Sequence, residues 1–361
     1  MAVQTQTPAP AVDHDKLMAF LGKVIGELGA TVNAGLIVAG DRLGLYKAMA
    51  DAGPITSSEL AEKTRTSERY IREWLNAQAA GGYVTYDAST GRYLLPPEQA
   101  MALADEDSPA FVGGAFELAT ATIKAEPKIE QAFKSGAGVG WHEHDAGVFT
   151  GCERFFRPGY NANLVSSWIP ALDGVGEKLR VGATVADVGC GLGASSRLMA
   201  ETYPRSRVTG FDYHPESIAL ARQKAKAVGL ADRLHFEVAG AQAFPGTGYD
   251  LITMFDCLHD MGDPVGAARH VREALAADGT WLIVEPIAGD SIEENLNPVG
   301  RAYYAFSNFL CVPNSLSQEV GLALGAQAGE KKIRDVVTAA GFTRFRRVGE
   351  TPFNAVYEVR R

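Results

Sequence analysis

The chain has 361 residues, of which 46% are hydrophobic and 21% are charged. A chain of this length accommodates two or three domains, each with a core of its own. Its 34 basic and 43 acidic residues give a net charge of −9, which argues against a nucleic-acid backbone as the main partner. The four cysteines show no paired spacing, which excludes a disulfide framework or a cysteine-rich zinc module and fits a reducing compartment.

Neither the N-terminal residues nor the longest uncharged run suggests export or a membrane span. The first ten residues contain no basic segment and no apolar stretch of the kind found in secretory signals. The longest uncharged run, 302–318, includes proline, asparagine and serine, so it is too polar to span a bilayer. We therefore expect a cytoplasmic protein without a membrane partner.

The first hundred residues are expected to form a mainly helical domain. Apolar side chains recur at spacings of three and four from Leu17 to Leu28. Helices are predicted over 58–64 and from Thr66 to about Ala80, followed by a hairpin between residues 83 and 95. This order is typical of a winged helix. The charges of the would-be recognition helix cancel, which favours a dimerisation and lid domain over DNA binding, and we expect no nucleic-acid partner.

From about Val181 onward, strands and helices alternate. The predicted strands cover residues 184–188, 207–212, 234–238, 250–256 and 280–285, and a closing pair covers 345–348 and 355–359. The alternation predicts an α/β fold with a doubly wound, Rossmann-like, mostly parallel sheet of seven strands. Its ligand should lie beyond the carboxyl ends of the strands, where the strand order reverses.

These patterns divide the chain into three predicted parts. Residues 1–105 form the winged-helix domain, 106–170 a helical connector and lid, and 171–361 the Rossmann-like domain. Within the last part, the connection 286–330 is long for this fold, so we expect a helical insertion with a functional role.

A glycine-rich loop between the first predicted strand and its helix carries the strongest signal. It reads Asp187-Val-Gly189-Cys-Gly191-Leu-Gly193-Ala, and Asp212 ends the next strand. The glycines satisfy the dinucleotide pattern, but a pyrophosphate has no use for a carboxylate at 187. An aminoacyl group does, because its ammonium needs a negative partner while its carboxylate binds backbone N–H groups. A dinucleotide and a cofactor with an aminoacyl group would both use Asp212 to bind ribose hydroxyls. Asp212 therefore does not distinguish the two kinds of cofactor.

With Asp256 at the end of the fourth strand, this loop resembles that of the class I S-adenosylmethionine-dependent methyltransferases. The winged helix and the Leu258-His259-Asp260 segment resemble the branch that methylates small molecules at oxygen. The resemblance implies S-adenosyl-L-methionine as cofactor, a homodimer, and a small-molecule acceptor. The cofactor-binding residues expected on this basis are Asp187, Gly189, Gly191, Gly193, Asp212, Tyr213, Gln242, Asp256 and Tyr160. Many members of this family place an acidic residue near the adenine. Residues 239–245 contain no acid, so we expect Gln242 to take its place.

The resemblance also implies a catalytic role for His259. A hydroxyl acceptor must lose its proton, and a histidine has a pKa near neutrality. We expect His259 to be the base, with Asp260 or Asp263 orienting its ring. If the acceptor atom is sulfur or nitrogen, His259 would instead bind the substrate.

Two further segments supply candidate substrate contacts. His142 lies in a His-x-His segment beside acids, where a substrate wall or solvated loop is favoured over a metal site, and we expect no metal. Tyr304 and Phe309 lie in the 286–330 connection, where they could form an apolar lid over the acceptor. Two other functions stay open: a cofactor-sensing winged-helix regulator and a nicotinamide dehydrogenase.

Overall fold

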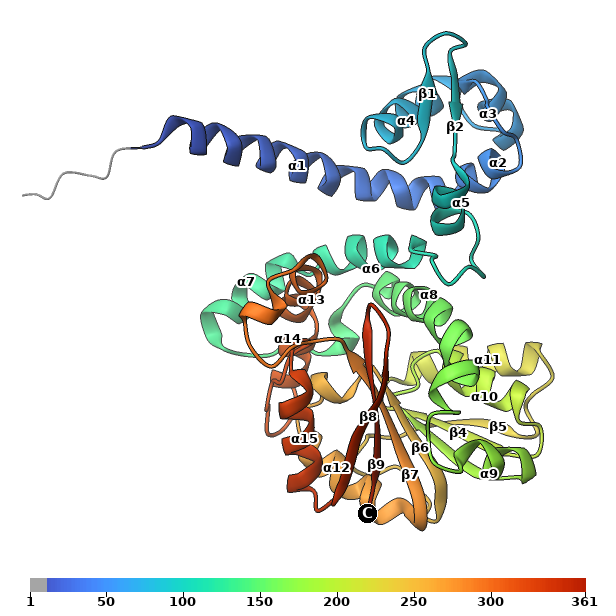
Figure 1. Ribbon diagram of the computed structural model, residues 1–361, viewed down its shortest axis with the longest axis vertical. Helices are drawn as coiled ribbons and strands as arrows, with labels where there is room; N and C mark the ends of the chain where they lie inside the picture. The colour runs from blue at the N-terminus through green and yellow to red at the C-terminus, as the bar shows by residue number, and fades with distance from the viewer. Residues whose placement is uncertain (1–11) are drawn as a thin grey trace, which may run out of the picture. The chain divides into compact units, whose positions relative to one another are not determined.

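The computed structural model describes residues 12–361, and the chain forms two compact units that meet in sequence between Asp105 and Glu106. The first unit consists of α1 (His14–Arg42), α2 (Leu45–Ala50), α3 (Ser57–Thr64), α4 (Glu68–Ala80), β1 (Thr85–Asp87), β2 (Arg92–Leu94) and α5 (Pro97–Leu103). The predicted order of two helices and a hairpin is confirmed in α3, α4, β1 and β2 (Figure 1).

Local hydrogen bonds explain where these elements begin. Thr56 and Glu59 form a capping box at the start of α3, and Arg92 of β2 pairs with Glu59 at 2.9 Å, which ties the hairpin to that helix end. On α4, Glu68 pairs with Arg72 four residues on (2.6 Å). Arg69 makes the same pairing with Glu73, so the surface of α4 carries no net positive charge from these four residues.

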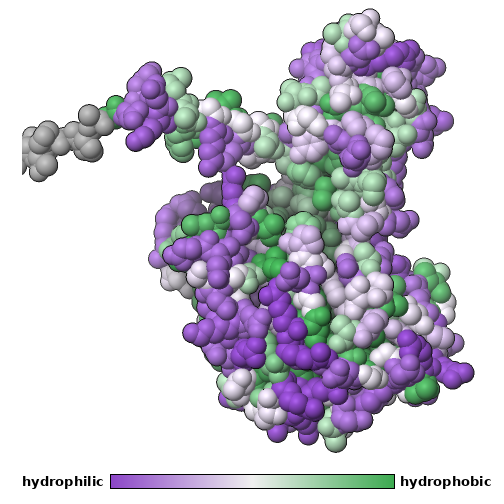
Figure 2. All heavy atoms as spheres, viewed as in Figure 1, coloured by the Kyte–Doolittle hydropathy of each residue, from purple (hydrophilic) through white to green (hydrophobic). Residues whose placement is uncertain are grey.

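The helical spacing predicted near Leu17 continues through 29 residues as α1. Its large apolar side chains stay exposed rather than packing into a core. They are Leu17, Met18, Phe20, Leu21, Val24, Ile25, Leu28, Val32 and Leu36. At 100° per residue, these nine positions fall within one stripe about 160° wide. Figure 2 shows hydrophobic surface on α1 among hydrophilic side chains. Among the described residues, α1 is also the one helix whose length and composition would suffice to cross a membrane, a test that apolar helices of other proteins pass as well.

The second unit is built on a seven-stranded sheet (Figure 1). Its strands are β3 (Thr184–Val188), β4 (Arg207–Asp212), β5 (Leu234–Val238), β6 (Tyr249–Phe255), β7 (Leu275–Pro286), β8 (Arg344–Glu350) and β9 (Asn354–Arg360). Their order across the sheet is β5-β4-β3-β6-β7-β9-β8, and only β9 and β8 run antiparallel to their neighbours. After β3, the chain adds β4 and then β5 on one side of β3. It then returns to add β6 and β7 on the other side of β3, so the strand order reverses between β3 and β6. The predicted fold class is confirmed.

Alternate residues of each strand face opposite sides of the sheet, and both faces are buried. On β3, for example, Val185 packs into one apolar cluster and Ala186 into the other. The helices that cover the sheet are α9 (Val175–Val181), α10 (Ala194–Thr202), α11 (Pro215–Ala227), α12 (Pro264–Ala274) and α15 (Gly329–Ala339). β7 begins at Leu275, five residues before the predicted start at 280, and it follows directly on α12.

Two groups of helices extend beyond this sheet. The first precedes it and comprises α6 (Gly113–Ile123), α7 (Glu126–Ser135) and α8 (Ala146–Asn163). The second comprises α13 (Pro298–Phe309) and α14 (Cys311–Leu316), in the long connection after β7. Residues on α6, α8 and α13 share one apolar cluster with Cys311 of α14, so the two groups pack together although some 150 residues separate them in sequence.

Candidate active site

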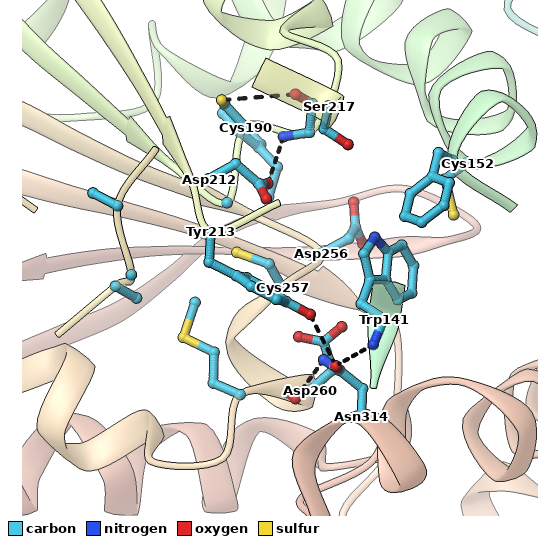
Figure 3. Close-up of a pocket in the computed structure, with 18 of the residues that line it drawn as sticks. Trp141, Cys152, Cys190, Asp212, Tyr213, Ser217, Asp256, Cys257, Asp260 and Asn314 are labelled. Atoms are coloured by element: carbon cyan, nitrogen blue, oxygen red, sulfur yellow. Dashed lines mark hydrogen bonds between the residues drawn. The ribbon is translucent and has the colours of Figure 1, made fainter. Parts of the chain in front are cut away.

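A cavity of about 790 Å³ opens at the carboxyl ends of β3, β4 and β6. Its wall is formed by the loop after β3, by the neighbouring turn after β6, by α8 and by α14 (Figure 3). The cavity therefore lies where the strand order reverses, as expected for a ligand site in this class of sheet.

The glycine loop forms the floor of this cavity. Gly189 and Gly191 line it, and both have left-handed backbone conformations, with φ of 75° and 52°. A Cβ on Gly189 would lie 2.6 Å from the Cys257 sulfur, so only glycine fits there. Gly193, the residue before α10, does not line the main cavity. A Cβ on Gly193 would lie 2.5 Å from the Phe236 ring, so this glycine allows close helix–strand packing.

The structure corrects the expected orientation of Asp187. This side chain is fully buried, and it does not line the cavity. The Ser195 hydroxyl donates to one carboxylate oxygen (2.6 Å), as does that of Ser196, and the Thr253 hydroxyl donates to the other oxygen (2.8 Å). Burial raises the pKa of this carboxyl, and the three hydroxyls counteract that shift. Asp187 therefore links the loop to α10 and β6, rather than presenting its charge to a ligand.

Asp212 has the position that the sequence predicts for it. It lies at the end of β4 and lines the cavity, where the Gly191 N–H donates to one carboxylate oxygen and the His214 N–H to the other, both at 2.9 Å. Each oxygen retains a lone pair for a further donor. Tyr213 and Gln242 also line the cavity.

Asp256 and Tyr160 meet in the cavity wall. The Tyr160 hydroxyl donates to one oxygen of Asp256 (3.2 Å), and the Asn354 amide of β9 donates to the other (2.7 Å). Asp256 has a left-handed backbone, with φ of 51°, which aspartate and asparagine tolerate better than most residues. Burial, and then the nearby charge of Glu285, raise the pKa of Asp256 to about 8.

The structure separates His259 from Asp260, which the sequence places side by side. Asp260 lines the cavity, and burial raises its pKa to about 7. His259 is buried outside the lining, with Nδ1 at 2.6 Å from Glu285 and Nε2 at 3.3 Å from the Cys311 sulfur. Burial lowers the pKa of His259, but Glu285 and Cys311 outweigh that effect and hold it well above its ordinary value.

This arrangement does not match the expected role of His259 as the base. Both ring nitrogens have partners within the protein, and an imidazole with a raised pKa is already protonated near neutral pH. Asp260 does not orient the ring either, since Glu285 does so. Asp263 caps α12 by accepting from the Gly266 N–H.

The three residues expected to contact a substrate do not line the cavity. His142 is exposed, and neither it nor Tyr304 nor Phe309 lines the cavity. Phe309 packs with the apolar cluster around Ile129. Residues close to them in the sequence or in the fold do line the cavity: Trp141, Phe149, Cys152, Phe156, Met261 and Asn314.

Asn314 connects three segments of the cavity wall. Its Oδ1 accepts from the backbone N–H of Trp141 and from the Tyr213 hydroxyl, each at 3.1 Å. Its amide donates to the backbone oxygen of Asp260 (3.1 Å) (Figure 3). Reasoning from the sequence missed this residue. The one available signal was its place in the long connection after β7, which was already expected to be functional.

The described residues contain no group of three or more histidine, cysteine or acidic side chains placed to hold a metal ion. His144, the second histidine of the His-x-His segment, is buried, and neither ring nitrogen has a hydrogen-bond partner. Burial lowers its pKa, so it stays neutral.

Comparisons with known proteins identify both halves of the chain. Residues 31–105 match the Rv2258c-like winged HTH domain, and residues 179–327 match the methyltransferase domain. The chain thus contains an Rv2258c-like winged HTH domain followed by a methyltransferase domain. The winged-helix order and the cavity at the β3–β6 reversal agree with this assignment.

Individual relatives resemble parts of the chain. Trans-aconitate 2-methyltransferase of Streptomyces avermitilis is 35% identical over 115 residues, which are 32% of this chain and 43% of that protein. Acetylserotonin O-methyltransferase of Mus musculus is 31% identical over 183 residues, 49% of this chain and 43% of that protein. The chain thus matches less than half the length of these curated relatives. In fold, the human N-acetylserotonin methyltransferase solved in complex with SAM covers 98% of this chain and 99% of its own, with 17% identity and a TM-score of 0.69.

Proposed function

We propose that this protein transfers a methyl group from S-adenosylmethionine to a hydroxyl group of a small-molecule acceptor. The observation that carries the proposal is one continuous cavity. It begins at the glycine loop and Asp212, and it ends at two carboxyl groups of raised pKa, Asp256 and Asp260.

The residues at the first end fit the cofactor. Gly189 and Gly191 leave the loop backbone bare, so that an aminoacyl carboxylate can approach backbone N–H groups near the start of α10. Asp212 keeps acceptor capacity for the two ribose hydroxyls, and Gln242, which lines the same cavity, is proposed to contact the adenine. With Asp187 turned into the protein, Asp256 takes over the proposed role of negative partner for the ammonium group, positioned by Tyr160 and Asn354. When bound, the cofactor supplies a methyl group on a positively charged sulfur.

We propose Asp260 as the base, in place of His259. A pKa of about 7 suits a group that must accept a proton near neutral pH, and Asp260 lines the cavity whereas His259 does not. The protonated His259 lowers the pKa of Asp260 and thereby counteracts part of the effect of burial. His259 and Glu285 are thus positioning residues behind the base. The walls formed by α8 and α14 exclude water and hold the acceptor in line with the methyl group.

Nitrogen or sulfur remains the alternative acceptor atom. A neutral amine or a thioether needs little general-base assistance, so the rate for such an acceptor would depend less on Asp260. The regulator hypothesis is disfavoured by α4, where Arg69 and Arg72 are paired with glutamates of the same helix. Absence of a band shift with DNA at low ionic strength would eliminate it.

We also propose that a second copy of the chain covers the exposed apolar stripe of α1, forming a homodimer. Leu21→Glu together with Leu28→Glu should yield monomers in light scattering, because each change places a charge within the stripe. Ala30→Glu, about 160° from Leu28 on the exposed helix, is the matched control and should stay dimeric. Identical masses for all three proteins would contradict the proposal. A cytoplasmic location is proposed on the four free thiols.

Calorimetry and labelled-methyl transfer test the main proposal. S-adenosylhomocysteine should bind and NAD should not, and binding of NAD alone would refute the assignment. With a metabolite extract as acceptor source, Asp260→Asn should lower the transfer rate at saturating substrate roughly a hundredfold. Asp278→Asn removes an exposed carboxylate that pairs with Lys178, and it should have no effect. His259→Gln should shift the pH profile toward alkaline pH, because Asp260 loses a cationic neighbour. An unshifted profile would argue against the positioning role.

A further inference from the structure

The cavity lining is one-sided in charge. Six acidic side chains line it, whereas no lysine, arginine or histidine does among the residues that the structure describes. The six are Glu153, Asp212, Asp256, Asp260, Asp263 and Glu319. Such a composition is unfavourable for a ligand that brings further negative charge, since like charges repel strongly in a partly desolvated space.

Several of these acids have structural roles. Glu153 pairs with Lys224 (3.2 Å) and with Arg157 (3.5 Å), and Asp263 caps α12. Asp212 accepts two backbone N–H groups in the part of the cavity proposed for the ribose. Glu319 is exposed, and Asp256 is proposed above for the ammonium group of the cofactor, so Asp260 remains for the acceptor side.

Asp256 and Asp260 have no basic side chain as a direct ion-pair partner in the structure. Asp256 accepts hydrogen bonds from Tyr160 and Asn354, which are neutral. The charged groups that act on it are Glu285, which raises its pKa, and His259, which lowers it. Asp260 is influenced by the same two residues and by Asp212. A cation brought by a ligand would stabilise the ionised form of both carboxyl groups.

The surrounding wall is aromatic. Trp141 and Phe149 meet edge to face with ring centroids 5.6 Å apart, and Phe156 stacks on Tyr160 at 6.2 Å. All four rings line the same cavity as the two carboxyl groups (Figure 3 draws Trp141 on this side). Aromatic faces attract cations and also accommodate the apolar part of a ligand.

We propose, resting on the methyltransferase function proposed above, that the acceptor is a small amine that is cationic at neutral pH and has an apolar or aromatic body. One oxygen of Asp260 accepts from its ammonium group and the other remains for the hydroxyl proton, while its body packs between Trp141, Phe149 and Phe156. A polycarboxylate is excluded by the same lining, so this chain differs in acceptor from its relative named for trans-aconitate.

Three indole compounds that differ only in the charge of the side chain test this preference. Tryptamine is cationic, tryptophol is neutral and indolepropionate is anionic. Each is titrated calorimetrically into the full-length protein saturated with S-adenosylhomocysteine. We expect tryptamine to bind about tenfold more tightly than tryptophol, since hydrogen bonds to charged groups are stronger than neutral ones, and indolepropionate to bind most weakly.

Two variants assign the preference to the proposed carboxyl group. Asp260→Asn should reduce the tryptamine–tryptophol ratio to near one, while Asp278→Asn, the surface control, should leave it unchanged. Equal binding of tryptamine and tryptophol, tighter binding of indolepropionate, or binding of none of the three overturns the inference. Failure of S-adenosylhomocysteine to bind in the first step overturns the proposed function instead, so the two failures are distinguishable.

Discussion

Replacing Asp256 by asparagine should change how stability depends on pH. The pKa of this carboxyl is about 8 in the folded protein, against an ordinary value of 3.8. The folded state therefore holds a proton that the unfolded state releases between about pH 4 and pH 8. In this window the native state binds more protons, so the free energy of unfolding falls as pH rises, by about 1.4 kcal/mol per pH unit for one group.

Between pH 5 and pH 7 this effect amounts to about 3 kcal/mol. Asparagine has no proton to lose, keeps the shape of the side chain and tolerates the φ of 51° at this position. The Asp256→Asn protein should therefore lose about 3 kcal/mol less stability than the wild type over that interval. Asp260 and Asp212 titrate in both proteins, so the difference between the two isolates Asp256.

Urea unfolding followed by tryptophan fluorescence measures this difference. Trp168 and Trp281 are buried in the two apolar clusters on either face of the sheet, so their emission reports on the unit that contains the site. Equal changes in the free energy of unfolding between pH 5 and pH 7 for both proteins would refute the raised pKa of Asp256. They would also contradict the proposal that Asp256 binds a cationic group of a ligand.

Three further outcomes are expected. Gly189→Ala should weaken S-adenosylhomocysteine binding more than tenfold in calorimetry, because its Cβ would lie 2.6 Å from the Cys257 sulfur. Gly174→Ala is the control and should bind normally, because Gly174 has a similar φ of 71° but open space around it. Binding of S-adenosylmethionine at pH 7 should release about 0.9 proton more from the wild type than from Asp256→Asn, measured in buffers of different ionisation enthalpy, and no difference would show that the cofactor does not meet this carboxyl. Cys311→Ala should lower the pKa of His259 in an NMR titration, and Glu285→Gln should lower it further, since Glu285 has the larger effect; an unchanged value in both would contradict the contacts of the ring.

The fold and the glycine-loop end of the cavity were predictable because their signals are local. Strand and helix periods, the glycine loop and Asp212 at a strand end are each contained in a few consecutive residues. Parallel strands then bring their carboxyl ends to one edge, so the loop and Asp212 meet without further information.

The orientation of Asp187 was not predictable in the same way. It depends on strand pairing, which places Thr253 of β6 directly opposite Asp187 of β3. Ser195 and Ser196, just after the loop, were a signal in the sequence itself, because hydroxyls next to a buried carboxylate are its natural donors.

The acceptor end depends on contacts that are distant in sequence. Asn314 bonds to Trp141 across 173 positions, and Cys311 reaches His259 across 52. No period or motif encodes such pairs, so reasoning from the sequence selected His142 and Phe309, which are close in sequence to cavity-lining residues but do not line the cavity themselves. Adjacent residues such as His259 and Asp260 also diverge, because a short turn after β6 points their side chains to different sides.

Of the seven strands in this sheet, β9 comes last along the sequence, yet it occupies an inner position. It pairs with β7 on one side and β8 on the other, and its first residue, Asn354, holds Asp256. A ribosome must therefore release β9 before this wall of the pocket can acquire its final shape. A nascent chain stalled before Asn354 should then be unable to retain S-adenosylhomocysteine.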